Sequence, residues 1–237
     1  DTTPEGEQVN IYGNHVGSWN FAATAYLNQW KVKIYYEHYF DDHSQMFFQY
    51  GRWKDGHIGL EITFPKNRFI DTFVYEGLGT KDQTGPMLYD SFWGEFEEQI
   101  SAKDNYYNHY LYQGWQHWGM GIGNPLLPGP IYNKNGQITF ISNRVLAHHI
   151  GFCGSPCQSL SYRMLLSYSR HWGTYDNPLN EIKKQFNSLF EVTYAPQQLK
   201  GWSFTVSGAM DRGSILGNNY GGMLVIRKQG IIKSGNK

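Results

Sequence analysis

The sequence has little cysteine, no long apolar run and no net charge, and each absence excludes a class of protein. Its 237 residues contain two cysteines, and 20 Lys and Arg residues balance 20 Asp and Glu residues. No run of about 18 apolar residues occurs, which excludes a transmembrane helix. A neutral chain has no broad basic field to hold a phosphate backbone, so we expect no nucleic-acid partner.

The two cysteines, Cys153 and Cys157, stand close together in Cys-Gly-Ser-Pro-Cys. A zinc site usually adds further Cys or His at finger-like spacing, which is absent, so we expect no metal. Such sparing use suits an oxidising compartment, where the two thiols either form a small loop disulfide or stay unpaired. Gly121 and Gly123 lack the strand-to-helix context of a phosphate-binding loop, and we expect no cofactor.

Aromatic residues and glycine are abundant, with 18 Tyr, 14 Phe, 8 Trp and 27 Gly. Aromatic residues favour strands and glycine favours turns, so the composition predicts an all-β fold. Alternation of apolar and polar residues marks nine strands, each near the roughly ten residues that a tilted strand needs to cross a bilayer. These strands cover about 15–27, 32–37, 58–64, 69–78, 138–150, 160–168, 190–194, 202–211 and 222–228.

The predicted connections alternate in length. Short turns are expected at 28–30, 65–68, 154–158 and 195–201, and long ones at about 41–56, 79–137, 171–184 and 211–220. Tight periplasmic turns and long outer loops are typical of an up-and-down barrel, whereas a Greek-key sandwich has no reason to place its long loops at one end. We therefore predict an antiparallel up-and-down transmembrane β-barrel, with 79–137 as a long extracellular loop. A soluble sandwich is the alternative.

The charged residues and the number of strands refine this prediction. Lys or Arg facing mid-bilayer lipid costs about 2–4 kcal/mol, so Lys33, Glu61, Arg163 and Glu191 are expected to face a wet lumen and to pair across strands.

Closed bacterial barrels generally have an even number of strands, whereas nine are predicted here. The chain is then either one barrel domain over 1–237 with a miscounted strand, or the C-terminal part of a larger barrel. Since it has no initiator Met and no signal peptide, either a leader has been removed or the chain is a piece of something longer.

Three segments carry a resemblance to a known family. They are the run YYEHYFDDHS at 35–44, the runs SNRV and AHH within 142–149, and the runs DRGS and GNN within 211–219. These segments resemble the Wzi-like capsule assembly outer-membrane proteins, and the similarity extends over most of the chain. The EHYFDD run is distinctive and the others are less specific. The Tyr- and Gly-rich sequence looks most like versions from Bacteroides-type bacteria.

The resemblance implies a barrel of roughly 18 strands, within the range of bacterial outer-membrane barrels. It also implies binding of capsular or other surface polysaccharide and attachment of that polysaccharide at the surface of a Gram-negative cell. The chain would be the C-terminal half of such a barrel, which agrees with nine predicted strands. The family's N-terminal helical portion has no match here, so closure of the barrel by these 237 residues alone stays open. The implied partners are the polysaccharide, outer-membrane lipid and other envelope proteins.

The long loop contains most of the candidate glycan site. Its stretch 106–118 places aromatic rings beside amides and imidazoles, and sugars stack their C–H faces on rings while their hydroxyls bond to amides and carboxylates. The alternative is that the rings only pack the loops together and plug the lumen. Asp41 and Asp42 beside His43 are too few oxygen ligands to predict a metal. The candidate glycan-binding residues are Asp41, Asp42, Trp53, Tyr110, Trp115, His117, Trp118 and Trp172.

Catalysis is not expected. Glu95 and Glu97 would supply the paired carboxylates of glycoside hydrolysis, but acidic groups beside aromatics are usually solvated or capping. His148 and His149 with Ser142 make no nucleophilic triad, because adjacent strand residues point to opposite faces. We predict a non-enzymatic, lectin-like protein. An outer-membrane diffusion channel or transporter, and less so a carbohydrate-active enzyme, remain alternatives.

Overall fold

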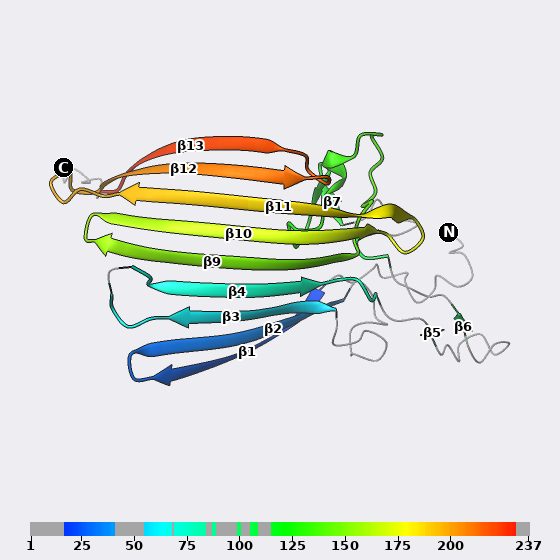
Figure 1. Ribbon diagram of the computed structural model, residues 1–237, viewed down its shortest axis with the longest axis horizontal. Helices are drawn as coiled ribbons and strands as arrows, with labels where there is room; N and C mark the ends of the chain where they lie inside the picture. The colour runs from blue at the N-terminus through cyan, green and yellow to red at the C-terminus, as the bar shows by residue number, and fades with distance from the viewer. Residues whose placement is uncertain are drawn as a thin grey trace, which may run out of the picture.

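The computed structural model describes residues 17–40, 55–67, 69–83, 105–108 and 115–230, together with the backbone of 87–88 and 99–100. Nine long strands dominate it, and Figure 1 shows how they lie side by side. They are β1 (Gly17–Leu27), β2 (Trp30–Phe40), β3 (Gly56–Thr63), β4 (Thr72–Gly79), β9 (Val145–Cys157), β10 (Leu160–Gly173), β11 (Pro178–Tyr194), β12 (Trp202–Gly213) and β13 (Asn219–Lys228).

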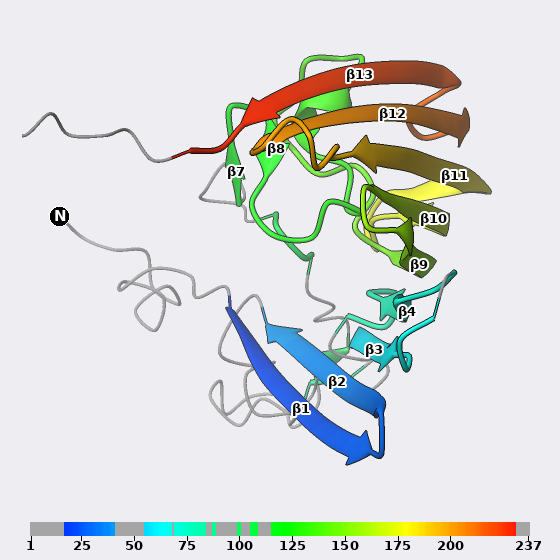
Figure 2. The same cartoon turned by 90° about the vertical axis from the view of Figure 1, so that its left-hand side faces the viewer.

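These strands form one antiparallel sheet in sequence order, β1-β2-β3-β4-β9-β10-β11-β12-β13. The predicted all-β, up-and-down arrangement is therefore confirmed. Viewed from the end, the sheet bends into a trough with β1 and β13 as its two margins (Figure 2). Within the described residues β1 pairs only with β2, and β13 only with β12. Among those residues, no helix is long and apolar enough to cross a membrane.

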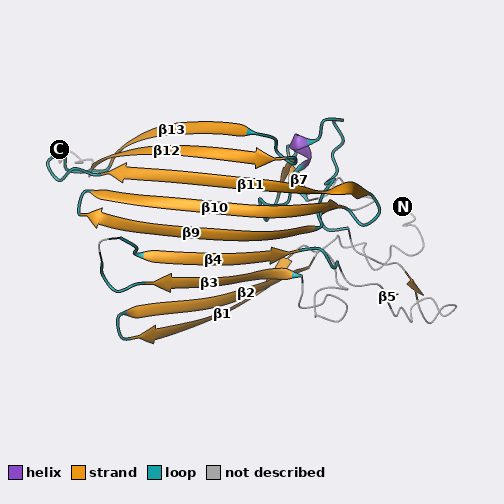
Figure 3. Cartoon of the chain, in the orientation of Figure 1, coloured by secondary structure: helices purple, strands orange, loops and turns teal. Residues whose placement is uncertain are grey.

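The trough has two distinct ends. Two-residue turns at 28–29 and 158–159, with the connections at 64–71 and 195–201, lie at what we call the turn end. The capped end holds the connections at 174–177, at 214–218 and between β4 and β9. The last connection contains β5 (Met87–Leu88), β6 (Gln99–Ile100), β7 (Gln116–His117), β8 (Met120–Gly121) and the 3-10 turn η2 (Pro130–Tyr132). Figure 3 shows η2 as a short helical turn beside β7.

Several strand limits differ from the prediction. β11 begins at Pro178, so the expected long connection at 171–184 is a four-residue turn. The polar composition of Asn180-Glu181 and Lys183-Lys184 predicts a loop, but these residues lie in β11. β9 begins at Val145 instead of 138 and continues to Cys157. Strict alternation of short and long connections was therefore wrong at the capped end.

Of the two alternatives left open for the cysteines, the structure has the unpaired one. Cys153 and Cys157 are both free thiols, and both lie on β9. A strand rises about 3.3 Å per residue, so two positions four apart are separated by roughly 13 Å. A disulfide needs Cα atoms within about 7 Å. Because β9 extends past the expected turn, the two thiols lie too far apart to pair.

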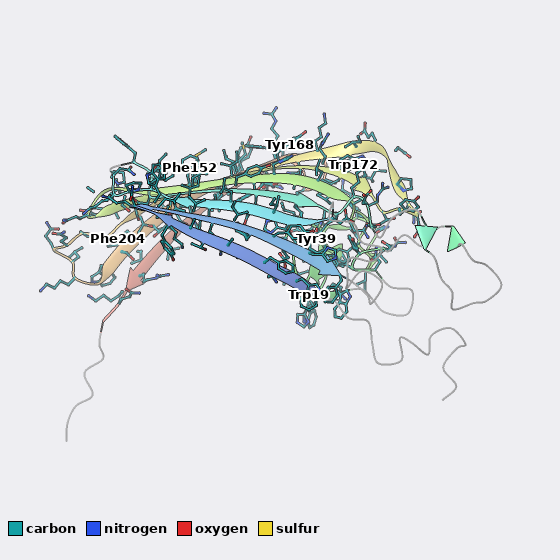
Figure 4. All side chains as sticks on the ribbon, turned by 90° about the horizontal axis from the view of Figure 1, so that it is seen from below. Trp19, Tyr39, Phe152, Tyr168, Trp172 and Phe204 are labelled. Carbon is teal, nitrogen blue, oxygen red and sulfur yellow. The ribbon has the colours of Figure 1, made fainter. Side chains whose placement is uncertain are left out.

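The two faces of the sheet differ in chemistry. The convex face is apolar and uncovered: Ile34 is 55% exposed and Val206 is 61% exposed. Figure 4 shows Phe152, Tyr168 and Trp172 along the outer edge of the curved sheet. No second long sheet covers this face within the described part of the chain. Other exposed side chains of this face are Trp19, Phe21, Ile58, Ile150, Phe190, Leu224 and Ile226.

A small core lies at the capped end, on the concave side. Residues 105–108 and 115–144, here called the capping segment, pack against β4 and the start of β9 there. The buried core consists of Leu78, Leu127, Val145 and Ala147, with Tyr39, Tyr107 and Leu126 packed against it. Apolar burial therefore joins the capping segment to the sheet.

Candidate functional site

Four of the eight candidate glycan-binding residues lie in the described part of the chain. Trp115, His117 and Trp118 come together at the β7–β8 hairpin of the capping segment. Trp172 lies near the end of β10, on a separate element. Asp41, Asp42, Trp53 and Tyr110, like Glu95 and Glu97, lie outside the described residues.

Trp118 occupies the tip of the hairpin in an uncommon backbone conformation. Trp118 and Gly119 both have positive φ, 52° and 78°. A two-residue type I′ hairpin turn requires this, and Asn or Gly usually supplies it. The left-handed region costs a side-chain-bearing residue roughly 1–2 kcal/mol. The Gln116 Oε1 atom accepts a 2.7 Å hydrogen bond from the Gly119 amide and holds the turn. The indole is nevertheless 84% exposed, so the strained turn presents a large apolar ring to the surroundings.

The 3-10 turn η2 supports this hairpin from below. The Gly119 carbonyl accepts a 2.8 Å hydrogen bond from the Ile131 amide. The backbones approach so closely that a Cβ on Gly129 would lie 2.7 Å from the Gly119 oxygen. The resulting exposed surface, which we call the hairpin platform, consists of His117, Trp118, Met120, Ile131 and Tyr132. Rigid support under exposed rings is a feature of binding surfaces.

Other rings of the same segment are structural. Tyr106 packs edge-on against Tyr39 with centroids 5.9 Å apart, and Tyr107 lies 5.1 Å from Phe140. Asn108 bonds the Phe140 backbone twice, donating to its carbonyl and accepting from its amide, each at 2.8 Å. The packing alternative therefore holds for these rings. The rings of the hairpin platform, in contrast, are exposed and free to meet a large ligand.

A buried polar network fixes the capping segment to the sheet, and sequence analysis missed it. The Asp55 carboxylate, 2% exposed, accepts hydrogen bonds from the amides of Asp82 (2.9 Å) and Gln83 (2.5 Å) and from the Tyr106 hydroxyl (2.8 Å). Burial raises the pKa of Asp55 above its usual value, and these three hydrogen bonds oppose that rise. Asn143 accepts from the Gln83 amide at 3.0 Å and donates to the Tyr106 carbonyl at 2.8 Å. Isolated polar residues in loops form no sequence pattern that would reveal this network.

The concave face carries a row of polar side chains in register across the sheet. Glu76, His149, Ser167, Asn187 and Asp211 are successive cross-strand partners. His149 Nδ1 lies 2.7 Å from Ser167 Oγ, and Asn187 donates a 2.6 Å hydrogen bond to Asp211. A hollow of about 300 Å³ opens where this row meets the capping segment at Asn124 and Leu126. The row offers alternating donors and acceptors of the kind that hydroxyl-rich ligands use.

Charged side chains on the same face pair across strands, as predicted for Arg163 and Glu191, whereas Glu61 pairs with Lys31 and the expected Lys33 lies over the Tyr35 ring instead. Lys31 lies 3.5 Å from Glu61, and Arg163 lies 3.4 Å from Glu191. His57 sits between two carboxylates, 3.6 Å from each, and Tyr35 donates a hydrogen bond to one of them. In the described residues, no group of three or more His, Cys, Asp or Glu side chains is placed to hold a metal ion.

The histidines of β9 confirm that neighbouring positions face opposite ways. His148 Nδ1 lies 2.8 Å from the Tyr75 hydroxyl on the convex side, while His149 contacts Ser167 on the concave side. Ser142 is buried, with its Oγ 3.4 Å from His171 Nδ1, and the His171 Nε2 atom is 2.8 Å from Ser169 Oγ. This serine therefore has no exposed position from which to attack a substrate.

The fold and site define a class: a curved antiparallel sheet, apolar outside and polar inside, capped at one end by a segment that exposes aromatic rings. Comparison of the chain with models of protein families, with curated proteins and with solved structures finds no match.

Proposed function

We propose that this chain forms part of the wall of an outer-membrane β-barrel in a Gram-negative bacterium and binds surface or capsular polysaccharide without catalysis. The observation that supports the membrane position is the uncovered apolar convex face over all nine strands. Full burial of one Ile, Leu or Phe side chain contributes about 1.5–3 kcal/mol. Such a continuous exposed apolar surface is uncommon in soluble monomers and marks contact with lipid or protein. Lipid hydrocarbon accounts for it over the whole sheet.

The direction of the charged groups supports the same proposal. Lys31, Glu61, Arg163 and Glu191 lie on the concave face and pair there. The convex mid-strand positions opposite them are apolar. This division fits a barrel with a lipid-facing outside and a wet inside.

The margins of the sheet agree with a larger wall. Unpaired strand edges invite association, and membrane strands tolerate no open edge in hydrocarbon. We infer that β1 and β13 are completed by further strands, as the resemblance to Wzi-like capsule assembly proteins implies. In this arrangement the capped end faces the cell exterior and the turn end faces the periplasm.

Membrane insertion is testable by the electrophoretic mobility of the unheated protein. We expect the chain, expressed with any residues that accompany it in its gene, to fractionate with outer membranes and to migrate faster unheated than boiled. A monodisperse protein that stays in aqueous buffer without detergent, with no heat-dependent shift, would contradict the barrel.

The hairpin platform supports the glycan-binding part of the proposal. Trp118 and Tyr132 expose flat rings at the capped end, and His117 adds a hydrogen-bonding group beside Trp118, with ring centroids 6.1 Å apart. Stacked sugar faces and bonded hydroxyls use this combination. Because η2 already supports the hairpin rigidly, the platform loses little conformational entropy when a ligand binds.

The test compares Trp118→Ala with Tyr26→Ala, a matched loss of a highly exposed ring at the turn end. Binding of the purified variants to surface polysaccharide extracted from the bacterium that carries the gene is measured by calorimetry in detergent. We expect about tenfold weaker binding for Trp118→Ala, equal to about 1.4 kcal/mol, and no change for Tyr26→Ala. Equal affinities for both variants and the parent would remove the platform from the proposal.

A channel is the second candidate, favoured by the ionic concave face. Planar-bilayer recording separates the two functions, since a pore conducts steadily and a barrel filled by its capping segment does not. Ohmic current that persists in the presence of polysaccharide would favour transport.

A further inference from the structure

A group of cations gathers on the convex face at the capped end. Arg170 on β10 is the direct cross-strand partner of Lys184 on β11. Arg212 on β12 is the partner of Phe186, two positions from Lys184 and on the same face. Arg144 lies beside β10, where its carbonyl accepts a 3.0 Å hydrogen bond from the Trp172 amide. Together with Lys81, these residues form what we call the basic rim.

Within the described part of the chain, no carboxylate forms a salt bridge with the basic rim. Asp176 and Glu181, two described acidic residues in adjoining segments, appear in none of the salt bridges of the structure. On the concave face, Lys31 and Arg163 each have a carboxylate partner. Like charges grouped without counter-charges repel one another and attract an anion.

Aromatic rings hold three of these cations in place. Lys81 Nζ lies 4.9 Å from the centre of the Trp172 ring, and the Arg170 guanidinium lies 5.4 Å from it. The Arg144 guanidinium lies 5.3 Å from the Tyr175 ring, and its Nε donates a 3.2 Å hydrogen bond to the Lys81 carbonyl. Cation–π contacts orient the charges while leaving their hydrogen-bond donors available.

The order of side chains along the strands indicates which kind of anion the basic rim suits. From the capped end inward, the convex face shows the basic rim, then the rings of Tyr168 and Phe186, then Ile150, Leu166 and Phe190. Charge, aromatic ring and aliphatic side chain follow in the same order as phosphate, headgroup interface and acyl chain in a bilayer leaflet. This order suits an anion whose molecule also has hydrocarbon chains.

We propose that the basic rim binds the phosphate groups of a phosphorylated glycolipid in the leaflet at the capped end. This inference rests on the proposed membrane position of the sheet. An acidic polysaccharide fits less well, because the rim lies on the convex side and continues into the apolar face, whereas the hairpin platform lies on the concave side. Bidentate Arg contacts suit phosphate oxygens, and two Arg with one Lys on adjacent strands provide several donors to one headgroup.

The experiment uses a triple variant, Arg144→Gln, Arg170→Gln and Lys184→Gln, with a matched control at the turn end, Lys66→Gln, Lys200→Gln and Lys228→Gln. Lys228 also lies over a tryptophan, 5.3 Å from the Trp202 ring, so the control removes a similar cation–π contact. Each protein is reconstituted in phosphatidylcholine nanodiscs that contain bisphosphorylated lipid A or the same lipid without phosphates. Native mass spectrometry after detergent extraction counts the lipid A molecules retained.

We expect the parent protein and the turn-end control to retain bisphosphorylated lipid A, and the rim variant to retain at least tenfold less. None should retain the dephosphorylated lipid. Equal retention by the rim variant and the parent would overturn the basic rim as a lipid site. So would displacement of the lipid by inorganic phosphate alone, or rim-dependent retention of an acidic polysaccharide in its place. A protein that inserts but retains no lipid A refutes this inference only, whereas a protein that fails to insert refutes the membrane position as well.

Discussion

Asp55 and Trp118 reverse the usual distribution of polar and apolar side chains. The carboxylate of Asp55 is buried where three donors converge on it, and the indole of Trp118 is exposed at a strained turn. Buried polar groups persist in folded proteins when every partner is supplied. Here the satisfied network around Asp55 holds the capping segment in place, and that segment in turn presents the exposed ring of Trp118.

Replacement of Asp55 by Ala should loosen the capping segment while leaving the sheet intact. The change leaves two backbone amides and the Tyr106 hydroxyl without their acceptor, and a buried unsatisfied donor costs about 1–3 kcal/mol. Hydrogen exchange should accelerate in residues 80–83 and 105–108 and stay slow in β10. Asp71→Ala, which removes an acceptor used by Ser155 at the turn end, is the control. Unchanged exchange in 80–83 would show that the network is dispensable.

Titration of Asp55 should make the anchor dependent on pH. Burial raises the pKa of this carboxyl in the folded protein above its unfolded value of about 3.9. The stabilising contribution is then fully present below the unfolded pKa and is lost as the pH rises through the folded pKa. Exchange of the Gln83 amide, corrected for its intrinsic rate, should become faster over that interval. Asp55→Ala should remove the dependence, and a flat profile in the parent protein would contradict the prediction.

At the scale of elements, sequence alternation predicted the strands better than it predicted their ends. Nine strands were expected and nine long strands form, because side chains that alternate between an apolar and a polar face leave a period of two. Strand ends depend on hydrogen-bonding partners that are distant in sequence. β11 continues through polar residues because β10 pairs with it on both sides of them, Arg170 with Lys184 and Gly173 with Pro178. Residues 138–144 have an apolar pattern but serve the capping network through Asn143 instead.

The hairpin platform could be predicted from sequence only in part. The mixture of rings and amides at 106–118 indicated a ligand site, and Trp115, His117 and Trp118 do share one hairpin. Composition could not separate exposed rings from packed ones, since Tyr106 and Trp118 have the same local character. The separation depends on Asp55 and Phe140, which are distant in sequence.

Gly119→Ala tests whether the hairpin needs its close backbone contact with η2. Gly119 has φ 78°, and an added Cβ would lie 3.1 Å from the Ile131 amide nitrogen, so Ala brings both a conformational cost and a clash. Gly136→Ala is the matched control, with φ 70° and no atom within 4 Å of the added Cβ. In both variants alanine at a positive φ destabilises the fold by roughly 1–2 kcal/mol, but only Gly119→Ala should also weaken polysaccharide binding. Equal binding by the two variants would mean that the contact with η2 is unimportant.

At the scale of the whole molecule, the two faces of the trough predict opposite responses to charge. Val206→Lys places an ammonium group on the convex face of β12, where a mid-bilayer position costs about 2–4 kcal/mol. Ala209→Lys places the same group on the concave face of the same strand, where we expect a cost below about 1 kcal/mol. Urea titration of folding into phosphatidylcholine vesicles measures both. Similar losses at the two positions would be incompatible with a lipid-facing convex side.

The sheet also contains a single seam. Every neighbouring pair of strands is joined by a connection of at most 15 residues except β4 and β9, which residues 80–144 separate. Closing so long a loop has a larger entropic cost than forming a hairpin, so two hairpin blocks, β1–β4 and β9–β13, would assemble separately before they meet. Thr80 donates a hydrogen bond to the Asn143 carbonyl at 2.6 Å and accepts one from the Val145 amide at 2.8 Å, directly across this junction. The capping segment thus fastens the two hairpin blocks across their one long-range junction, so loss of the Thr80 hydroxyl should weaken the contact between the blocks more than the contacts within either of them.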